Sequence, residues 1–508
     1  EAQLCIGFGR HARLGAITYC AGQILANGFS PELRLRMSEE AREEQPFHAL
    51  IHDVESFRIE FVHGVRTPER LEQAEQRLRE RLDACRAAIG TVYQHFAAEG
   101  ISVGLVFRLR QVRTRIVRVR QLLSCLTSEH PEQEAARLLA GFVSVGRDRR
   151  SLRNLWATNS SLLAAKVTER SAETGEHYIS HNRSEYLQMV RRAAGGGLLM
   201  SVTTLLKFGL AALAFSAFWG GFWAGVNYSI SFVLIQLLHW TVATKQPAMT
   251  APAMAAKLKD MQSSEDATHT LEAFVDEVAN LVRTQVAAIL GNVLVVFPAA
   301  LVLSLLWWQM FGATPLDAAH AQSTLDSLHV LGPSALFAAY TGVLLFASSL
   351  IAGWVENWFV LRRLDSAIRY NPGFTRWLGK GRAKRWGDFW RANISGFAAN
   401  ISLGMMLGLT PAIAAFFGLG LEVRHVTLSS GQLGVASATF GLGVLALPAF
   451  WWALALLPLN GALNVIVSFY LAFRMALRAH NINGVERSRI YVAIRQRLRS
   501  KPSSFFLP

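Results

Sequence analysis

The chain contains little cysteine. Its 508 residues include four thiols, Cys5, Cys20, Cys85 and Cys125, all in the N-terminal part. No CxxC pair and no Cys/His spacing typical of a metal site occurs. The sequence therefore predicts no metal and no cofactor, and it favours reduced, structural thiols.

Other familiar signatures are also missing from the sequence. It holds no P-loop, no GxSxG motif and no dinucleotide fingerprint. Arg10 and Arg13 interrupt the first apolar stretch, so no secretory signal is recognised. Because the chain begins with Glu1 rather than Met, we expect that its natural start is missing. No alternating strand pattern of any length occurs, which favours an all-α protein.

The net charge of +15 is unevenly distributed along the chain. Residues 1–195 carry 28 basic and 23 acidic side chains, whereas residues 196–508 carry 23 basic and 13 acidic ones. Most of the excess therefore lies in the more apolar half. A soluble nucleic-acid-binding domain would show the opposite bias.

Long apolar runs begin after the glycines at 195–197. Each run has about the 20 residues that a helix needs to cross the hydrocarbon core of a bilayer. The sequence predicts about six spans, near residues 198–218, 222–243, 286–311, 333–355, 394–419 and 433–457. Residues 459–473 form a further apolar stretch.

Basic residues in the connections predict the orientation of these spans. The segment 356–393 carries nine basic and three acidic residues, and the tail from Arg474 carries eight basic residues and one acidic residue. The connection 312–332 has no Lys or Arg. Both basic segments are therefore expected in the cytoplasm. A seventh span at 459–473 would place the tail outside, so we interpret that stretch as interfacial or re-entrant.

The region before the spans is predicted to be a helical cytoplasmic domain. Thr67 and Pro68 form a helix start, and apolar residues then recur at steps of three and four on both sides of Gly100. This pattern predicts a helical hairpin within a bundle. The expected divisions are an N-terminal helical segment at 1–66, a bundle domain at 67–195, a transmembrane domain at 196–478 and a basic cytoplasmic tail at 479–508.

Six arginines lie between the apolar residues of the second helix of this hairpin, the one after Gly100. Three interpretations remain open for them: pairing with acidic residues of the first helix of the hairpin, contact with anionic lipid, and contact with nucleic acid. The residues are Arg108, Arg110, Arg113, Arg115, Arg118 and Arg120.

Two distinctive stretches carry a resemblance to a known family. The first is GEHYI, RSEY and RAAGGG between residues 175 and 197. The second runs from Asn227-Tyr228 through QLLH at 236–239 into ATKQPAMTAPA at 243–253. Together they resemble the Gram-negative bacterial membrane-protein family labelled "site-specific recombinase" (Gcr type), over most of the chain.

The family label implies DNA strand exchange, but the residues do not supply its chemistry. A tyrosine recombinase needs several cations and a histidine around the scissile phosphate, with a tyrosine as nucleophile. The nearest group is His181, Arg183 and Tyr186, whose spacing differs from the tyrosine-recombinase pattern. These three residues are the candidates for strand-exchange chemistry, and an enzyme is not the favoured interpretation.

Several polar residues in or beside the spans are candidate intramembrane or gate positions. Lys207 is either functional or oriented toward the interface, and His239 either moves a proton or is bonded locally. The segment Thr244-Lys245-Gln246-Pro247 is either a gate or a rigid turn. Asn227 belongs to the resembling stretch, and Glu356 either serves the site or forms an ion pair beside the basic segment.

Three functions remain open at this level. The first is a scaffold or transporter-like protein of the bacterial inner membrane, with both termini in the cytoplasm and a protein partner for its helical domain. The second is a membrane-tethered site-specific DNA recombinase, as the family label implies. The third is an intramembrane enzyme that uses Lys207 or His239. The lipid bilayer is the expected surrounding in each case.

Overall fold

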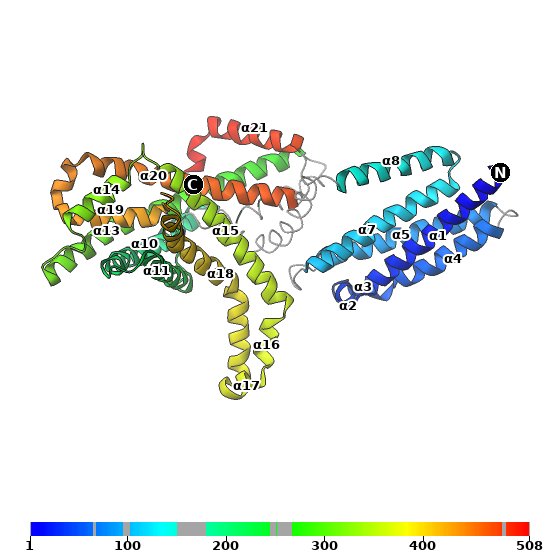
Figure 1. Cartoon of the computed structure of the whole chain (residues 1–508), viewed down its shortest axis with the longest axis horizontal. Helices are drawn as coiled ribbons and strands as arrows, with labels where there is room; N and C mark the ends of the chain where they lie inside the picture. Colours follow the sequence, from blue (N-terminus) through cyan, green and yellow to red (C-terminus); the bar gives the residue numbers. More distant parts are fainter. Residues whose placement is uncertain are drawn as a thin grey trace. The chain divides into compact units, whose positions relative to one another are not determined.

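A computed structural model of the chain describes residues 2–63, 68–94, 102–149, 179–243, 250, 254, 267–479 and 484–506. The described residues form 18 α-helices and no strand, which confirms the all-α expectation (Figure 1). The chain divides into two compact units, unit 1 at residues 1–163 and unit 2 at residues 164–508.

Unit 1 is a helical bundle. Its long helices are α1 (Ala2–Gly28), α4 (Pro46–His63), α5 (Pro68–Gln94), α7 (Val103–Thr127) and α8 (Pro131–Arg149), with α2 (Pro31–Arg34) and α3 (Glu39–Glu43) between α1 and α4. Helix α1 packs on α7, and α4 packs on α5. Pro68 and Pro131 begin α5 and α8, as their fixed backbone angle at a first helical position predicts.

The two apolar stripes predicted from the sequence form the core of this bundle. Leu78, Leu82, Leu109 and Val112 are fully buried in one cluster. Burial also raises the pKa of the Cys85 thiol to about 12, which keeps it protonated and unreactive. The second predicted stripe therefore packs inward, as the first does.

The arginines beside the second stripe have varied partners. Arg120 pairs with Asp83 of α5, and Arg108 lies 3.6 Å from Glu32. The guanidinium of Arg118 lies 4.1 Å from the centre of the Phe142 ring in α8. These three of the six arginines therefore have partners within unit 1.

Unit 2 contains the membrane helices. The long ones are α10 (Arg183–Ala212), α11 (Ala217–Leu237), α13 (Ala267–Phe311), α15 (Ser334–Leu361), α18 (Lys380–Phe416), α19 (Val426–Phe440) and α20 (Pro448–Ala479). Shorter elements are α14 (Ala318–Ser327), α16 (Leu364–Tyr370), α17 (Pro372–Leu378), the 3₁₀ helices η2 (Gly441–Ala446) and η3 (Pro502–Phe505), and α21 (Gly484–Ser500).

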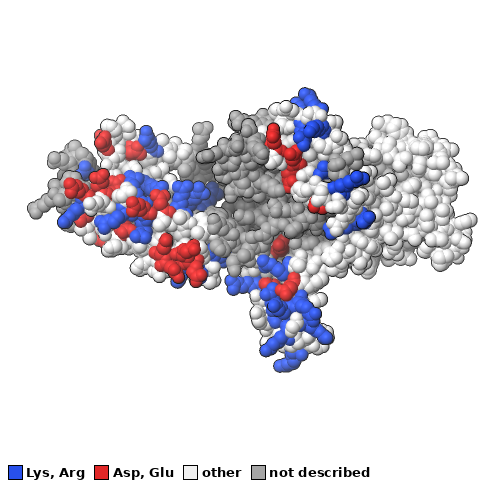
Figure 2. All heavy atoms as spheres, turned by 180° about the vertical axis from the view of Figure 1, so that it is seen from behind, with Lys and Arg blue, Asp and Glu red and all other residues white. Residues whose placement is uncertain are grey.

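Seven of the described helical segments are long and apolar enough to cross a membrane, with α19 and η2 counted together. The part of unit 2 formed by these helices shows a broad charge-free surface on the face drawn in Figure 2. Such a surface suits hydrocarbon as its solvent.

A basic arm projects from this bundle. It comprises residues 362–393, which form α16, α17 and the first turns of α18 (Figure 1). The arm joins the end of α15 to the start of α18, so these two helices run in opposite directions. We use "arm face" for this end of the bundle and "far face" for the opposite end.

Side-chain contacts give the direction of the remaining helices. Gly221 meets Gly408 while Gln236 meets Asn393, so α11 runs antiparallel to α18, toward the arm face. Helix α10 is joined to α11 by the short turn 213–216 and therefore runs toward the far face.

The directions of two other long helices, α13 and α20, follow from the helices to which they run parallel. Helix α13 is parallel to α10, because Thr284 bonds Ser180 and Asn292 meets Gly197. Helix α20 is parallel to α15, because Gly342 packs on Val467 while Phe346 packs on Ala472.

Helix α19 runs in the same direction as α18, the long helix before it. Thr427 bonds Asn292 at 3.1 Å and Gly434 packs on Phe297, so α19 runs parallel to α13, toward the far face. Helix α18 has already ended at the far face, so residues 417–425 must carry the chain back inward. This re-entrant segment begins with a turn at 417–418 and has no regular structure from 419 to 425, and nine residues span at most about 30 Å. Six helices therefore alternate in direction, and α19 is the returning half of a re-entrant hairpin.

The expected span boundaries differ from the structure in two places. The first turn lies at 213–216, not at Gly220 and Gly221, because those glycines lie inside α11. The expected span 433–457 is interrupted, because the helix ends before Gly441, which has φ +54°. Pro448 then begins a single helix that contains the last part of that span and the whole stretch 459–473. Pro458 lies inside that helix without ending it.

Glycines set the distance between α11 and α18. A Cβ on Gly408 would overlap the backbone of Gly221 and Gly225, and one on Gly404 would overlap Ser229. Removing the side chain lets the two backbones approach closely, which is how helices gain packing energy in lipid. The small-residue spacing in the sequence thus marks a real helix interface.

We expect Gly408→Ala to destabilise unit 2 by about 1–3 kcal/mol, because the added methyl overpacks this crossing. The matched control is Gly209→Ala in α10, where a Cβ meets nothing within 4 Å and helix propensity alone favours alanine. Thermal unfolding of the purified protein in detergent should separate the two variants. Equal midpoints would contradict the close crossing.

Candidate functional site

The tip of the re-entrant segment, residues 424–427, lies within the helical bundle and is held by side chains rather than by a helix. Asn292 in α13 is fully buried. Its Oδ1 accepts from the Ala243 amide at 2.7 Å and from Thr427 Oγ1 at 3.1 Å, and its Nδ2 donates to the Thr241 carbonyl at 3.0 Å. One carboxamide therefore joins three chain segments.

A second carboxamide caps the start of α19. Asn464 in α20 accepts from the Val426 amide at 3.1 Å and donates to the carbonyls of Arg424 and Ala338 at 3.1 and 2.8 Å. The Arg424 amide donates to Thr341 Oγ1 at 2.8 Å. These bonds satisfy backbone groups that cannot reach water at this depth.

One polar side chain beside the tip is incompletely paired. Asn460, one helical turn before Asn464, is fully buried and bonds only Ser429, at 3.4 Å, in the first turn of α19. Its Oδ1 has no partner among the described residues. A buried polar group in this state favours a bound polar molecule.

Charged residues lie along the re-entrant segment. Arg424 is buried and its guanidinium lies 2.5 Å from Glu422, whose side chain is 48% exposed. Arg424 also donates to the Ser327 carbonyl at 3.1 Å. An exposed carboxylate within a bundle of apolar helices suits contact with water, not lipid.

The three residues nearest to recombinase chemistry have separate surroundings. The His181 ring lies 3.1 Å from Glu277, and Arg183 is exposed at the start of α10. Tyr186 is buried in a cluster with Met189 and neighbouring alanines. A buried phenol cannot reach a duplex phosphate while α10 keeps this packing.

The other candidates from the sequence lie at different places in unit 2. Asn227 donates to the Thr203 carbonyl at 2.9 Å and so joins α11 to α10. His239 is exposed after α11 with φ +57°, and Glu356 is half-buried near the end of α15. Lys207 lies one helical turn after Thr204, which packs against Gly431 of α19. Thr244, Lys245, Gln246 and Pro247 lie outside the described residues.

Asn292, Thr427, Glu422 and Arg424 are not among the residues that the sequence marked as candidates. The signal that the sequence offers for Asn292 is an asparagine within a long apolar run. Only the folded chain brings it beside Thr427, which is 135 residues away.

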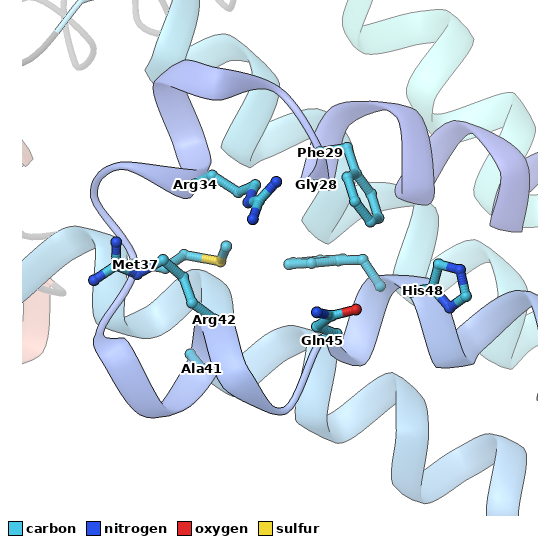
Figure 3. A pocket seen from close by; sticks show the side chains of 9 residues that line it. Gly28, Phe29, Arg34, Met37, Ala41, Arg42, Gln45 and His48 are labelled. Carbon is cyan, nitrogen blue, oxygen red and sulfur yellow. The ribbon is translucent and has the colours of Figure 1, made fainter.

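Unit 1 contains a separate cavity of about 100 Å³ between α1, α2, α3 and α4 (Figure 3). Met37, Ala41 and Phe47 are buried and give it an apolar floor. Arg34 reaches over it, and Gln45 lies at its edge with φ +42°. Its chemistry suits a small apolar group better than a cation, because no acidic residue lines it.

These observations define a class: a polytopic helical membrane protein with a re-entrant segment and an additional helical unit. The family model described as "Site-specific recombinase" matches residues 5–508, and the chain belongs to this family. No curated protein and no solved structure matches the chain. Among the described residues, no group of three His, Cys, Asp or Glu side chains could hold a metal ion.

Membrane topology can be tested with single cysteines in a background without native cysteines. Because the re-entrant hairpin adds no crossing, Lys380→Cys in the arm and Arg497→Cys in α21 should react with an impermeant maleimide from the same side. Leu442→Cys in η2 should react from the other side, together with Asp317→Cys. If α19 were a seventh crossing, the arm and tail cysteines would react from opposite sides.

Proposed function

We propose that this protein binds and translocates a small polar solute at the tip of its re-entrant segment, in the inner membrane of a bacterium, with both termini in the cytoplasm. The observation that carries this proposal is irregular backbone, residues 417–425, inside a bundle of membrane helices. Such backbone is tolerated at membrane depth where it is buried in protein or lines a water-filled path.

The surroundings of this segment support solute binding over a purely structural role. Transporters place their sites where a discontinuous helix begins, so that its free amides face the substrate. Here α19 begins beside Asn460, whose carboxamide has an unpaired end, and beside the buried Arg424. A scaffold gains nothing from an unpaired amide, because such a group costs about 1–3 kcal/mol when buried.

Asn460→Leu separates solute binding from structure. Leucine has a similar volume and removes the unpaired group, so stability in detergent should be unchanged or higher. Polar metabolites at about 1 mM that raise the melting temperature of the unaltered protein should no longer do so in the variant. Counterflow of the same metabolites in proteoliposomes should also be lost. The control is Asn227→Leu, a change at a carboxamide outside the site.

Two results would contradict the proposal. One is a panel of sugars, amino acids, organic acids and nucleosides in which no compound stabilises the protein. The other is failure of a small water-soluble thiol reagent to reach Ser429→Cys from either side of the membrane. Together they would favour a dry, packed core and hence a scaffold, with the expected protein partner on the helical unit.

The alternative is DNA strand exchange, which the description of the family favours. It predicts that the full chain binds duplex DNA with a steep salt dependence and forms a covalent adduct that Tyr186→Phe abolishes. Because Tyr186 is buried among apolar residues and the His181 ring contacts Glu277, we expect no adduct on a labelled duplex. A tyrosine-dependent adduct would establish the alternative.

A further inference from the structure

The basic arm is a built structure rather than a loose loop. Arg369 lies 2.6 Å from Asp388 and 3.6 Å from Asp365, so one guanidinium clamps α16 to α18. Gly387 allows this contact, since a Cβ there would meet the Arg369 side chain and the Asp365 backbone. Asn371 caps α17 by accepting from the amides of residues 373 and 374.

The clamp uses all the negative charge that the arm has. Residues 362–393 contain nine basic side chains and two acidic ones, and both acids lie against Arg369. The remaining cations give the arm its blue surface in Figure 2. Arg376, Lys380, Arg382, Lys384 and Arg385 are all exposed.

Large aromatic rings accompany these cations. Trp377 near the end of α17 is 84% exposed, and Tyr370, the last residue of α16, is 78% exposed. Phe374 and Trp386 are also exposed. Water is a poor solvent for an indole ring, so an exposed group of this kind marks a surface with a partner.

We propose that the arm docks on the anionic headgroups of a phospholipid surface. Tryptophan and tyrosine prefer the boundary between headgroups and hydrocarbon, and lysine and arginine are attracted to anionic lipid. Both residue types occur here on one projection. The arm is continuous with α18, a membrane helix of 37 residues, which keeps the arm near the bilayer. This proposal is independent of the solute site.

Nucleic acid is the competing polyanion. Phosphate contacts would use the same cations, and bases could stack on the exposed rings. Lipid is favoured because the arm is an extension of a membrane helix and because its rings are of the types enriched at bilayer interfaces.

The test uses the full chain in nanodiscs with an environment-sensitive fluorophore on Gly381→Cys, where added atoms meet nothing within 4 Å. Discs of phosphatidylcholine alone are compared with discs that also contain phosphatidylglycerol. We expect a blue-shifted, quencher-protected label only in the anionic discs. Added salt should reverse the shift, because it screens the attraction.

Variants assign the effect to the arm. Arg382→Gln/Lys384→Gln/Arg385→Gln should reduce the bound fraction at least tenfold, and Trp377→Ala should reduce it severalfold. The matched control removes three exposed arginines of unit 1, Arg77→Gln/Arg110→Gln/Arg113→Gln, and should leave the shift unchanged. An identical label signal in both lipids would overturn the proposal. A shift caused by a duplex or single-stranded oligonucleotide in neutral discs, with none from anionic lipid, would assign the arm to nucleic acid instead.

Discussion

The requirement that backbone amides and carbonyls be paired where water is absent governs unit 2. The long helices meet this requirement by themselves, whereas the irregular residues 417–425 cannot. Thr341 and Asn464, from two different helices, pair backbone groups of the re-entrant tip, and Asn292 from a third helix accepts from the Thr427 hydroxyl. The position of α19 therefore depends on a few polar side chains inside the bundle.

Close helix packing makes room for this hairpin. Gly404 and Gly408 bring α18 against α11, Gly434 brings α19 against α13, and Gly342 brings α15 against α20. In lipid, such contacts replace the hydrophobic effect as the source of stability between helices. Polar bonds then give the bundle its specificity, since each has a defined geometry.

The candidate site follows from the same arrangement. The path of the re-entrant segment brings the buried Arg424 against Glu422 and places the start of α19 beside Asn460. Neither group would exist if residues 417–425 formed a loop outside the membrane. The arm is a different kind of feature, because its charge and its exposed rings are arranged locally within about thirty residues.

Local patterns in the sequence determined the helical class, the apolar core of unit 1, the membrane character of the C-terminal three hundred residues and the helix starts at Pro68 and Pro131. These features depend on the periodicity and length of nearby residues, which a sequence displays directly. Only the tertiary structure decided that α19 returns from a re-entrant segment and that α20 continues through Pro458. The physical reason is that both outcomes depend on bonds between residues far apart in the chain, such as Asn292 with Thr427 and Asn464 with Val426.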